Sequence, residues 1–172
     1  MQDSTHTTGV LFVCMGNICR SPTAEGVFRK LQAERAPKLK LHVDSAGTHD
    51  YHLGQAPDAR AIAAARVRGI DIRRHRGRQV SAADFGAFDY ILAMDRTNLA
   101  ELRAIQPRAA RAELNLLLAY AADSPLDEVP DPYSGGADGF VRVLDLVELG
   151  AAGLLAHIRR RSDVAVESAH RL

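Results

Sequence analysis

The sequence predicts an α/β protein: a doubly wound sheet of about four parallel strands with helices on both faces. Short apolar runs alternate along the chain with longer amphipathic windows, which favours strands separated by helices. The apolar runs are continuous rather than alternating, as expected for strands buried on both faces. Strands joined through helices imply right-handed parallel crossovers, so ligands should bind at the carboxyl ends of the strands.

The first strand and helix are expected to flank a short loop. Val10 to Val13 is the expected strand. Ser21 is the expected N-cap, with Pro22 in the first turn, of a helix that reaches about Glu34. The apolar face of this helix is formed by Val27, Phe28 and Leu31.

The middle of the chain should contain two more strands and a helix. A second strand is expected from Leu39 to Asp44. The Ala- and Arg-rich residues 58–68 predict a helix, and Gly69 follows them in the C′ position. The sequence "FDYILAM", residues 88–94, predicts a third strand.

The remaining elements complete the sheet. A helix is expected from Asp95 to Ile105, ending before Pro107. "AELNLLLAY", residues 112–120, is interpreted as the fourth strand, although its periodicity also fits a helix. Residues 138–161 predict a long closing helix. The predicted strand order is 2-1-3-4, which is flavodoxin-like.

Length and composition bound the domain count and the class of partner. A chain of 172 residues, 47% hydrophobic, supports one core, so we expect a single domain over residues 1–172 with loose ends at about 1–7 and 162–172. The net charge of +1 predicts neither nucleic acid nor an anionic membrane as a partner. The apolar run 10–13 is too short for a signal sequence or membrane insertion, so we expect a cytoplasmic protein.

The stretch "LFVCMGNICRSPTAEG", residues 11–26, contains the candidate reactive residues Cys14 and Arg20. Between Cys14 and Arg20, Gly16 and Asn17 tolerate left-handed backbone, so the loop can turn its amides inward ahead of a helix. Inward amides and a helix N-terminus form an anion site, and Arg20 adds a charged fork that grips two oxygens. Phosphate is the expected ligand.

The same positive surroundings favour a thiolate at Cys14, ready for attack on phosphorus. Ser21 and Thr23 could donate hydroxyl hydrogen bonds to the sulfur. A zinc site is disfavoured, because Cys14 and Cys19 lack the spacing of a zinc half-site and no second pair completes it. We therefore expect no metal and no cofactor. Taken alone, Cys14 would be a buried structural cysteine, while Cys19 is either an apolar filler or a partner for a protective disulfide.

The string "VLFVCMGNICRSPTAEGVF" resembles the signature of the low-molecular-weight protein tyrosine phosphatases, with C-x5-R-S at the N-terminus. The resemblance continues in family order through "VDSAGT" (43–48), "RGIDI..H..RQV" (68–80), "DFGAFDYILAMDRTN" (84–98) and "VPDPYSG" (129–135). It implies hydrolysis of phosphotyrosine in proteins through a phosphocysteine. A tyrosine-phosphorylated protein is then the expected partner, and a bacterial setting leaves room for a cognate tyrosine kinase.

A general acid is needed to protonate the leaving oxygen. The resemblance implies that Asp131, between Pro130 and Pro132, is this acid and later the base for water. From the residues alone, the Pro-Asp-Pro sequence reads as a turn, and other acids remain open. These alternatives are Asp123, Asp127 and Asp138.

The resemblance also implies a set of supporting residues that hold the loop in shape. Asn17, Ser45 and His75 would form hydrogen bonds together with Ser21. Without the resemblance, His75 reads as a surface histidine among arginines. Asp95 caps the following helix on local grounds, and the resemblance places it near Arg20.

The pocket for the phosphotyrosine ring is expected between aromatic walls at Tyr51 and Tyr133. Ser134 departs from animal members, which carry a second aromatic residue there. The loop residues that would line the substrate site are Met15, Gly16, Asn17, Ile18 and Cys19. The arginine run from 66 to 78 is interpreted mainly as a solvated face. The alternative is that it attracts acidic segments near the phosphorylated residue of a substrate.

Three other functions compete with this one. Arsenate reductases with the same C-x5-R loop need further relay cysteines, and none follows Cys19. Phosphoarginine phosphatases of the family carry threonine where this chain has Ile18. A binding module without turnover would lack the nucleophile or the acid, and Cys14, Arg20 and Asp131 are all present.

Overall fold

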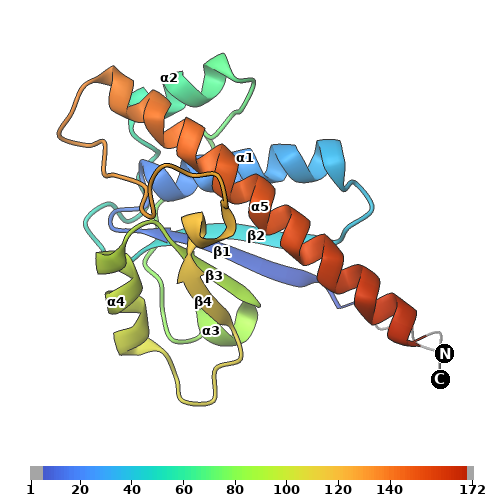
Figure 1. Ribbon diagram of the computed structural model, residues 1–172. Coiled ribbons are helices and arrows are strands. Elements are labelled where there is room, and N and C mark those ends of the chain that lie inside the picture. The colour runs from blue at the N-terminus through green and yellow to red at the C-terminus, as the bar shows by residue number, and fades with distance from the viewer. Residues whose placement is uncertain (1–5, 170–172) are drawn as a thin grey trace.

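The computed structural model describes residues 6–169 and contains one parallel sheet (Figure 1). The strand order is β2-β1-β3-β4, which confirms the predicted order 2-1-3-4. The four strands are β1 (Thr8–Cys14), β2 (Leu41–Gly47), β3 (Tyr90–Ala93) and β4 (Glu113–Leu116). Every neighbouring pair is parallel, so the carboxyl ends of all four strands lie at one edge of the sheet.

Helices cover both faces of the sheet, as predicted (Figure 1). One face carries α1 (Arg20–Arg35), α2 (Ala59–Val67) and α5 (Ala137–Ala169), and the other carries α3 (Asp84–Ala87) and α4 (Arg96–Ile105). Along β1, Val10 and Phe12 belong to the core under α1 and α5, while Leu11 and Val13 belong to the core under α3 and α4. Burial on both faces explains the continuous apolar runs.

Several element boundaries differ from the sequence prediction. The second strand is Leu41–Gly47 rather than 39–44, and its later end brings Ser45 and Gly47 to the site edge. The predicted strand at 112–120 divides into β4 and the 3-10 helix η1 (Leu117–Tyr120). An apolar run of this kind does not distinguish the two, because the leucines of η1 are buried as strand residues would be.

The ends of the chain also differ. The closing helix α5 extends past residue 161 to Ala169, so residues 162–169 are helical rather than a loose end. At the other end, residues 1–5 lie outside the described part, while the His6 side chain lies 3.0 Å from Asp89 Oδ1. Within residues 6–169 no helix combines the length and the apolar character that a membrane crossing requires.

The centre of α5 packs tightly against η1. A Cβ atom added to Gly153 would lie 1.8 Å from the carbonyl oxygen of Tyr120, so only glycine fits there. This contact holds the start of the 121–136 segment, which leads back to the site edge and into α5.

Candidate active site

The loop that joins β1 to α1 lies at the carboxyl edge of the sheet and runs from Cys14 to Arg20 (Figure 1). Three of its carbonyl oxygens accept hydrogen bonds from backbone amides of other segments: Cys14 O from Thr48 N (2.8 Å), Met15 O from His49 N (3.0 Å) and Ile18 O from Asp58 N (2.8 Å). In a trans peptide the next N–H points the opposite way from the carbonyl. The amides of residues 15, 16 and 19 therefore face the inside of the loop, where they can bind an anion.

Two residues let the loop fold this tightly. Asn17 has a φ of 57°, in the left-handed region expected for it. Gly47 at the end of β2 lies against the loop, because an added Cβ there would sit 2.5 Å from Met15 O. The loop is thus shaped both by its own sequence and by the neighbouring strand.

The Asn17 side chain fixes the loop through four hydrogen bonds. Its Nδ2 donates to Ser21 Oγ at 2.8 Å and to Ser45 Oγ at 3.1 Å. Its Oδ1 lies 3.0 Å from His75 Nε2 and accepts a hydrogen bond from Arg78 N at 3.0 Å. The predicted supporting residues therefore meet, and His75 is not a free surface histidine.

Glu25 lies behind these supporting residues and was not predicted from the sequence. Its Oε2 accepts a hydrogen bond from Ser45 Oγ at 2.7 Å and lies 3.4 Å from His75 Nδ1, while Oε1 pairs with Arg29 at 3.0 Å. Although burial favours the neutral acid, the bonds to His75, Ser45 and Arg29 hold the pKa of Glu25 below its usual range. Glu25 is therefore a carboxylate that orients Ser45 and His75.

The Cys14 sulfur faces donors on two sides. Ser21 Oγ lies 3.0 Å from Sγ, and the amide of Asn17 donates to Sγ at 3.3 Å. Ser21 is not the N-cap of α1 as predicted, because the helix begins at Arg20 and the hydroxyl is used by Cys14 and Asn17. Thr23 does not reach the sulfur, since its hydroxyl donates to Cys19 O at 2.7 Å.

Cys19 is buried at the base of the loop and forms no disulfide with Cys14. Burial, assisted by the nearby Asp58 carboxylate, raises the pKa of the Cys19 thiol to about 12. The two thiols therefore occupy different environments, and Cys19 is protonated at neutral pH.

The Arg20 side chain is only 2% exposed, and nearby carboxylates compensate its positive charge. Its Nη1 donates to Asp95 Oδ2 at 2.5 Å and to Val129 O at 3.1 Å, and its Nη2 lies 3.6 Å from Asp131 Oδ2. Burial opposes the charge, but Cys14 and Asp95 raise the pKa of Arg20 overall. The structure thus brings Asp95 to Arg20, as the family resemblance implied, and it also places Asp131 beside Arg20.

A cavity of about 240 Å³ opens above Cys14. Its lining comprises Cys14, Met15, Gly16, Ile18, Cys19, Arg20, Tyr51, His52, Asp131 and Tyr133. Tyr51 and Tyr133 are 64% and 52% exposed, so they stand at its rim rather than in the core. His52 was not predicted from the sequence, where its only signal is its position next to Tyr51.

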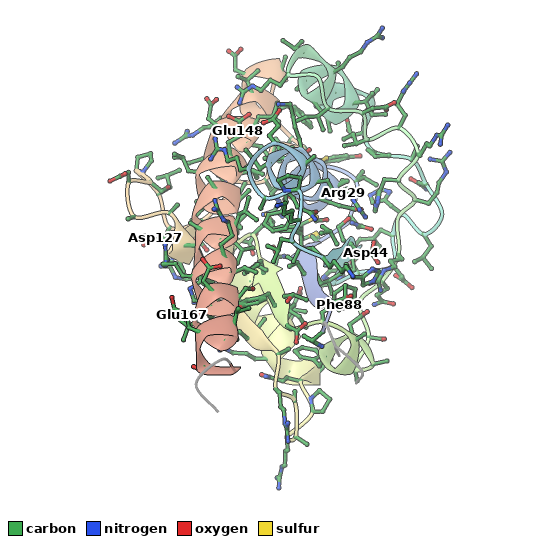
Figure 2. All side chains as sticks on the ribbon, turned by 90° about the vertical axis from the view of Figure 1, so that its right-hand side faces the viewer. Arg29, Asp44, Phe88, Asp127, Glu148 and Glu167 are labelled. Carbon is green, nitrogen blue, oxygen red and sulfur yellow. The ribbon has the colours of Figure 1, made fainter. Side chains whose placement is uncertain are left out.

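The other candidate acids do not line this cavity. Asp127 is exposed and forms an ion pair with Arg96 at 3.2 Å. Figure 2 shows it on a loop to the left of α5. Asp138 lies in the first turn of α5. Of the four aspartates considered, Asp131 is the one that contacts Arg20 and borders the cavity.

The arginine run is not uniformly a solvated face. Arg78 binds Asp44 at 2.9 Å and Asp84 at 3.1 Å, and these ion pairs join β2 to α3. Arg68 reaches Asp145 of α5 at 2.6 Å. Among the described residues, no group of three His, Cys, Asp or Glu side chains converges as a metal site would.

Comparisons with known proteins agree on the family. The family model for the low molecular weight phosphotyrosine protein phosphatases matches residues 9–164. The low molecular weight protein-tyrosine-phosphatase YfkJ of Bacillus subtilis is 41% identical over 155 residues, which cover 90% of this chain and 98% of the relative.

Solved structures share the fold across nearly the whole chain. A protein tyrosine phosphatase from Entamoeba histolytica superposes with a TM-score of 0.86 at 38% identity, covering 91% of this chain and 99% of that one. A Drosophila arginine phosphatase superposes with a TM-score of 0.81 at 35% identity, covering 87% and 97%.

Proposed function

Because the chain belongs to the low-molecular-weight phosphotyrosine protein phosphatase family, we propose that the cavity above Cys14 is the active site and that a phosphocysteine forms there. The protein is a protein-tyrosine phosphatase and therefore a hydrolase. One observation carries the assignment of the site: Cys14 and Asp131 border the same cavity, although they lie on distant parts of the chain.

In the first step, Cys14 Sγ attacks the phosphorus atom and the bond to the tyrosyl oxygen breaks. The hydrogen bonds from Ser21 and the Asn17 amide stabilise negative charge on the sulfur. The loop amides and Arg20 bind the three equatorial oxygens of the transferring phosphoryl group, where charge develops.

Asp131 gives its proton to the leaving tyrosyl oxygen in the same step. In the second step, a water molecule attacks the phosphocysteine, the Asp131 carboxylate takes the proton of that water, and the P–S bond breaks. The products are inorganic phosphate and the Cys14 thiolate, so the enzyme returns to its starting state. The distance of 3.6 Å between Asp131 Oδ2 and Arg20 Nη2 supports the role of Asp131 as the acid, because it places the carboxyl group beside the arginine that would bind the phosphate.

The cavity favours an aryl phosphate. Tyr51 and Tyr133 stand at the rim, and Ile18 adds an apolar surface inside. The fold itself does not separate phosphotyrosine from phosphoarginine, since an arginine phosphatase shares it. The family resemblance implies threonine at this position in phosphoarginine phosphatases, so Ile18 supports phosphotyrosine. The chain holds two cysteines, 14 and 19, which leaves no relay for arsenate reduction.

We further propose a tyrosine-phosphorylated protein as the substrate, and a cognate tyrosine kinase as the source of that phosphate. A cytoplasmic location fits this proposal, because the nucleophilic thiol must stay reduced.

A side-by-side assay tests this function. Phosphotyrosine peptide, phosphoserine peptide, phosphoarginine and arsenate are offered to the enzyme in the presence of a chelator. Phosphotyrosine should be turned over fastest, and Cys14→Ser should abolish that turnover. Faster hydrolysis of phosphoarginine, or full activity of Cys14→Ser, would contradict the proposal.

The acid is tested by Asp131→Asn across aryl phosphates of increasing leaving-group pKa. Loss of a positioned acid typically costs about 10²- to 10⁴-fold, and the loss should grow as the leaving group becomes poorer. Asp127→Asn, which changes an exposed aspartate of the preceding loop, is the matched control. Equal losses for all leaving groups would point to another acid.

A further inference from the structure

Arg60 of α2 holds the loop that carries Asp131. Its Nη2 donates to Tyr133 O at 3.0 Å, and its Nη1 donates to Gly135 O at 3.1 Å. The guanidinium carbon also lies 5.6 Å from the centre of the Tyr133 ring. One side chain therefore fixes both the backbone and the ring of Tyr133, a wall of the cavity.

Arg60 is itself held in a defined position. Its Nε and Nη2 atoms donate to the two carboxylate oxygens of Asp58, each at 3.0 Å. The Asp58 side chain also caps α2, since it accepts a hydrogen bond from Arg60 N at 2.8 Å. On the other side, the guanidinium lies 4.6 Å from the centre of the Phe140 ring in α5.

Asp58 connects this arrangement to the phosphate loop, because its backbone amide donates to Ile18 O at 2.8 Å. Contacts therefore run without interruption from the loop of Cys14, through Asp58 and Arg60, to the loop of Asp131. A two-pronged arginine suits this task better than lysine, since it can bind a carboxylate and two carbonyls at once.

Tyr133 is the last connection to the acid. Its amide donates to Asp131 Oδ1 at 3.0 Å, while its carbonyl accepts from Arg60. The surrounding segment, residues 121–136, contains no helix or strand, and nothing lies within 4 Å of the position that a Cβ at Gly136 would take. Among the described residues, the hydrogen bonds that join residues 132–135 to other elements come from Arg60.

We infer that Arg60 is a positioning residue that sets the acid loop, and with it Asp131, at a fixed distance from the phosphate loop. Arg60 does not line the cavity, so it acts through Asp131 and Tyr133 rather than on the substrate. The inference rests on the proposed role of Asp131 as the general acid.

Arg60→Gln is the first test. Misplacement of a catalytic group by about 1 Å costs on the order of 100-fold, so kcat/KM for a poor leaving group should fall about 10- to 100-fold. The fall should be smaller for a good leaving group, and inhibition by inorganic phosphate should be unchanged. Arg60→Lys, which keeps the charge and one donor group, should recover part of the loss even if Arg60→Gln folds poorly.

Two controls separate positioning from general stability. Arg66→Gln changes an exposed arginine in the last turn of the same helix and should match the wild type. The leaving-group-dependent part of the loss from Arg60→Gln should disappear in an Asp131→Asn background, because the acid that Arg60 positions is absent there. Thermal unfolding of each variant reports the structural cost independently.

Equal losses from Arg60→Gln in both backgrounds, or a loss independent of the leaving group, would overturn the inference. If Asp131→Asn causes the expected leaving-group-dependent loss and Arg60→Gln leaves kcat/KM unchanged, the inference about Arg60 is wrong and the proposed function still stands. If Asp131→Asn itself leaves the leaving-group dependence unchanged, the assignment of the acid fails first and this inference fails with it.

Discussion

Arg20 and Asp95 meet through Nη1 and Oδ2 at 2.5 Å, although 75 residues separate them in the chain. The two oxygens of Asp95 serve different purposes, because Oδ1 accepts a hydrogen bond from Asn98 N at 2.8 Å and caps α4. Asp95 thus links the start of a helix on one face of the sheet to Arg20, for which we propose phosphate binding. The remaining donors of Arg20 are left for the ligand.

Asp95→Asn should keep the cap of α4 and weaken the orientation of Arg20. A hydrogen bond to a charged group is worth about 1.5–3 kcal/mol, so the inhibition constant for inorganic phosphate should rise by about 10-fold or more. Inhibition kinetics measure the effect, and circular dichroism checks that α4 is intact. Unchanged phosphate affinity in a folded variant would show that Arg20 is oriented without Asp95.

The two cysteines should react differently with iodoacetamide. Because the pKa of Cys19 is raised to about 12, its thiol stays protonated and unreactive at pH 7. Mass spectrometry of the digested protein should find the label on Cys14, and inorganic phosphate should protect that site. Rapid labelling of Cys19 in the native protein would contradict this prediction.

Glu25→Gln should destabilise the protein in a pH-dependent way. The pKa of Glu25 is lowered on folding, so its contribution is complete above the usual value of about 4.3 and is lost as the pH falls through the lowered pKa. Near neutral pH we expect a loss of about 1–3 kcal/mol in unfolding free energy. The difference between variant and wild type should shrink below about pH 4. Denaturant unfolding at several pH values measures it, and a difference that stays constant with pH contradicts the assignment.

His49→Ala should loosen one wall of the cavity. The His49 ring stacks on Tyr51 with centroids 4.9 Å apart, and its Nε2 lies 3.0 Å from Glu101 Oε1. Such a ring pair is worth about 0.5–1.5 kcal/mol, so KM for a phosphotyrosine peptide should rise about 2- to 10-fold with kcat nearly unchanged. His42→Ala removes a similar stack on Phe88, away from the cavity, and serves as the control. Equal changes in KM in both variants would contradict a role of Tyr51 in substrate binding.

Much of the fold was predictable because the core strands are buried on both faces and read as apolar runs. The helix at residues 59–67 was also predictable, since Gly69 follows it with a φ of 74°. The four-residue helix α3 was not predicted, because it is only about one turn long and no hydrophobic period can repeat within it. Residues 162–169 carry no apolar stripe, so their helical state is not visible in the hydrophobic pattern.

The site was predictable where a residue's role is local or part of a matched motif. Cys14 and Arg20 follow from a strand, a glycine-containing loop and a helix, whereas Asp131 needed the family resemblance. Ser21 was misjudged because local cap preference predicts one partner and the folded protein supplies others, Cys14 and Asn17.

The segment that carries Asp131 is attached on both sides of the acid. Val129 donates through its amide to Met94 O at 2.8 Å and accepts from Arg20 at 3.1 Å, and Arg60 binds the carbonyl of Tyr133. If Asp131 is the acid as proposed, the number of residues between these anchors determines where its carboxyl group lies relative to the substrate. Insertions should be tolerated at 121–127, outside the anchors, while one added residue between 130 and 132 would leave the acid out of reach of the substrate.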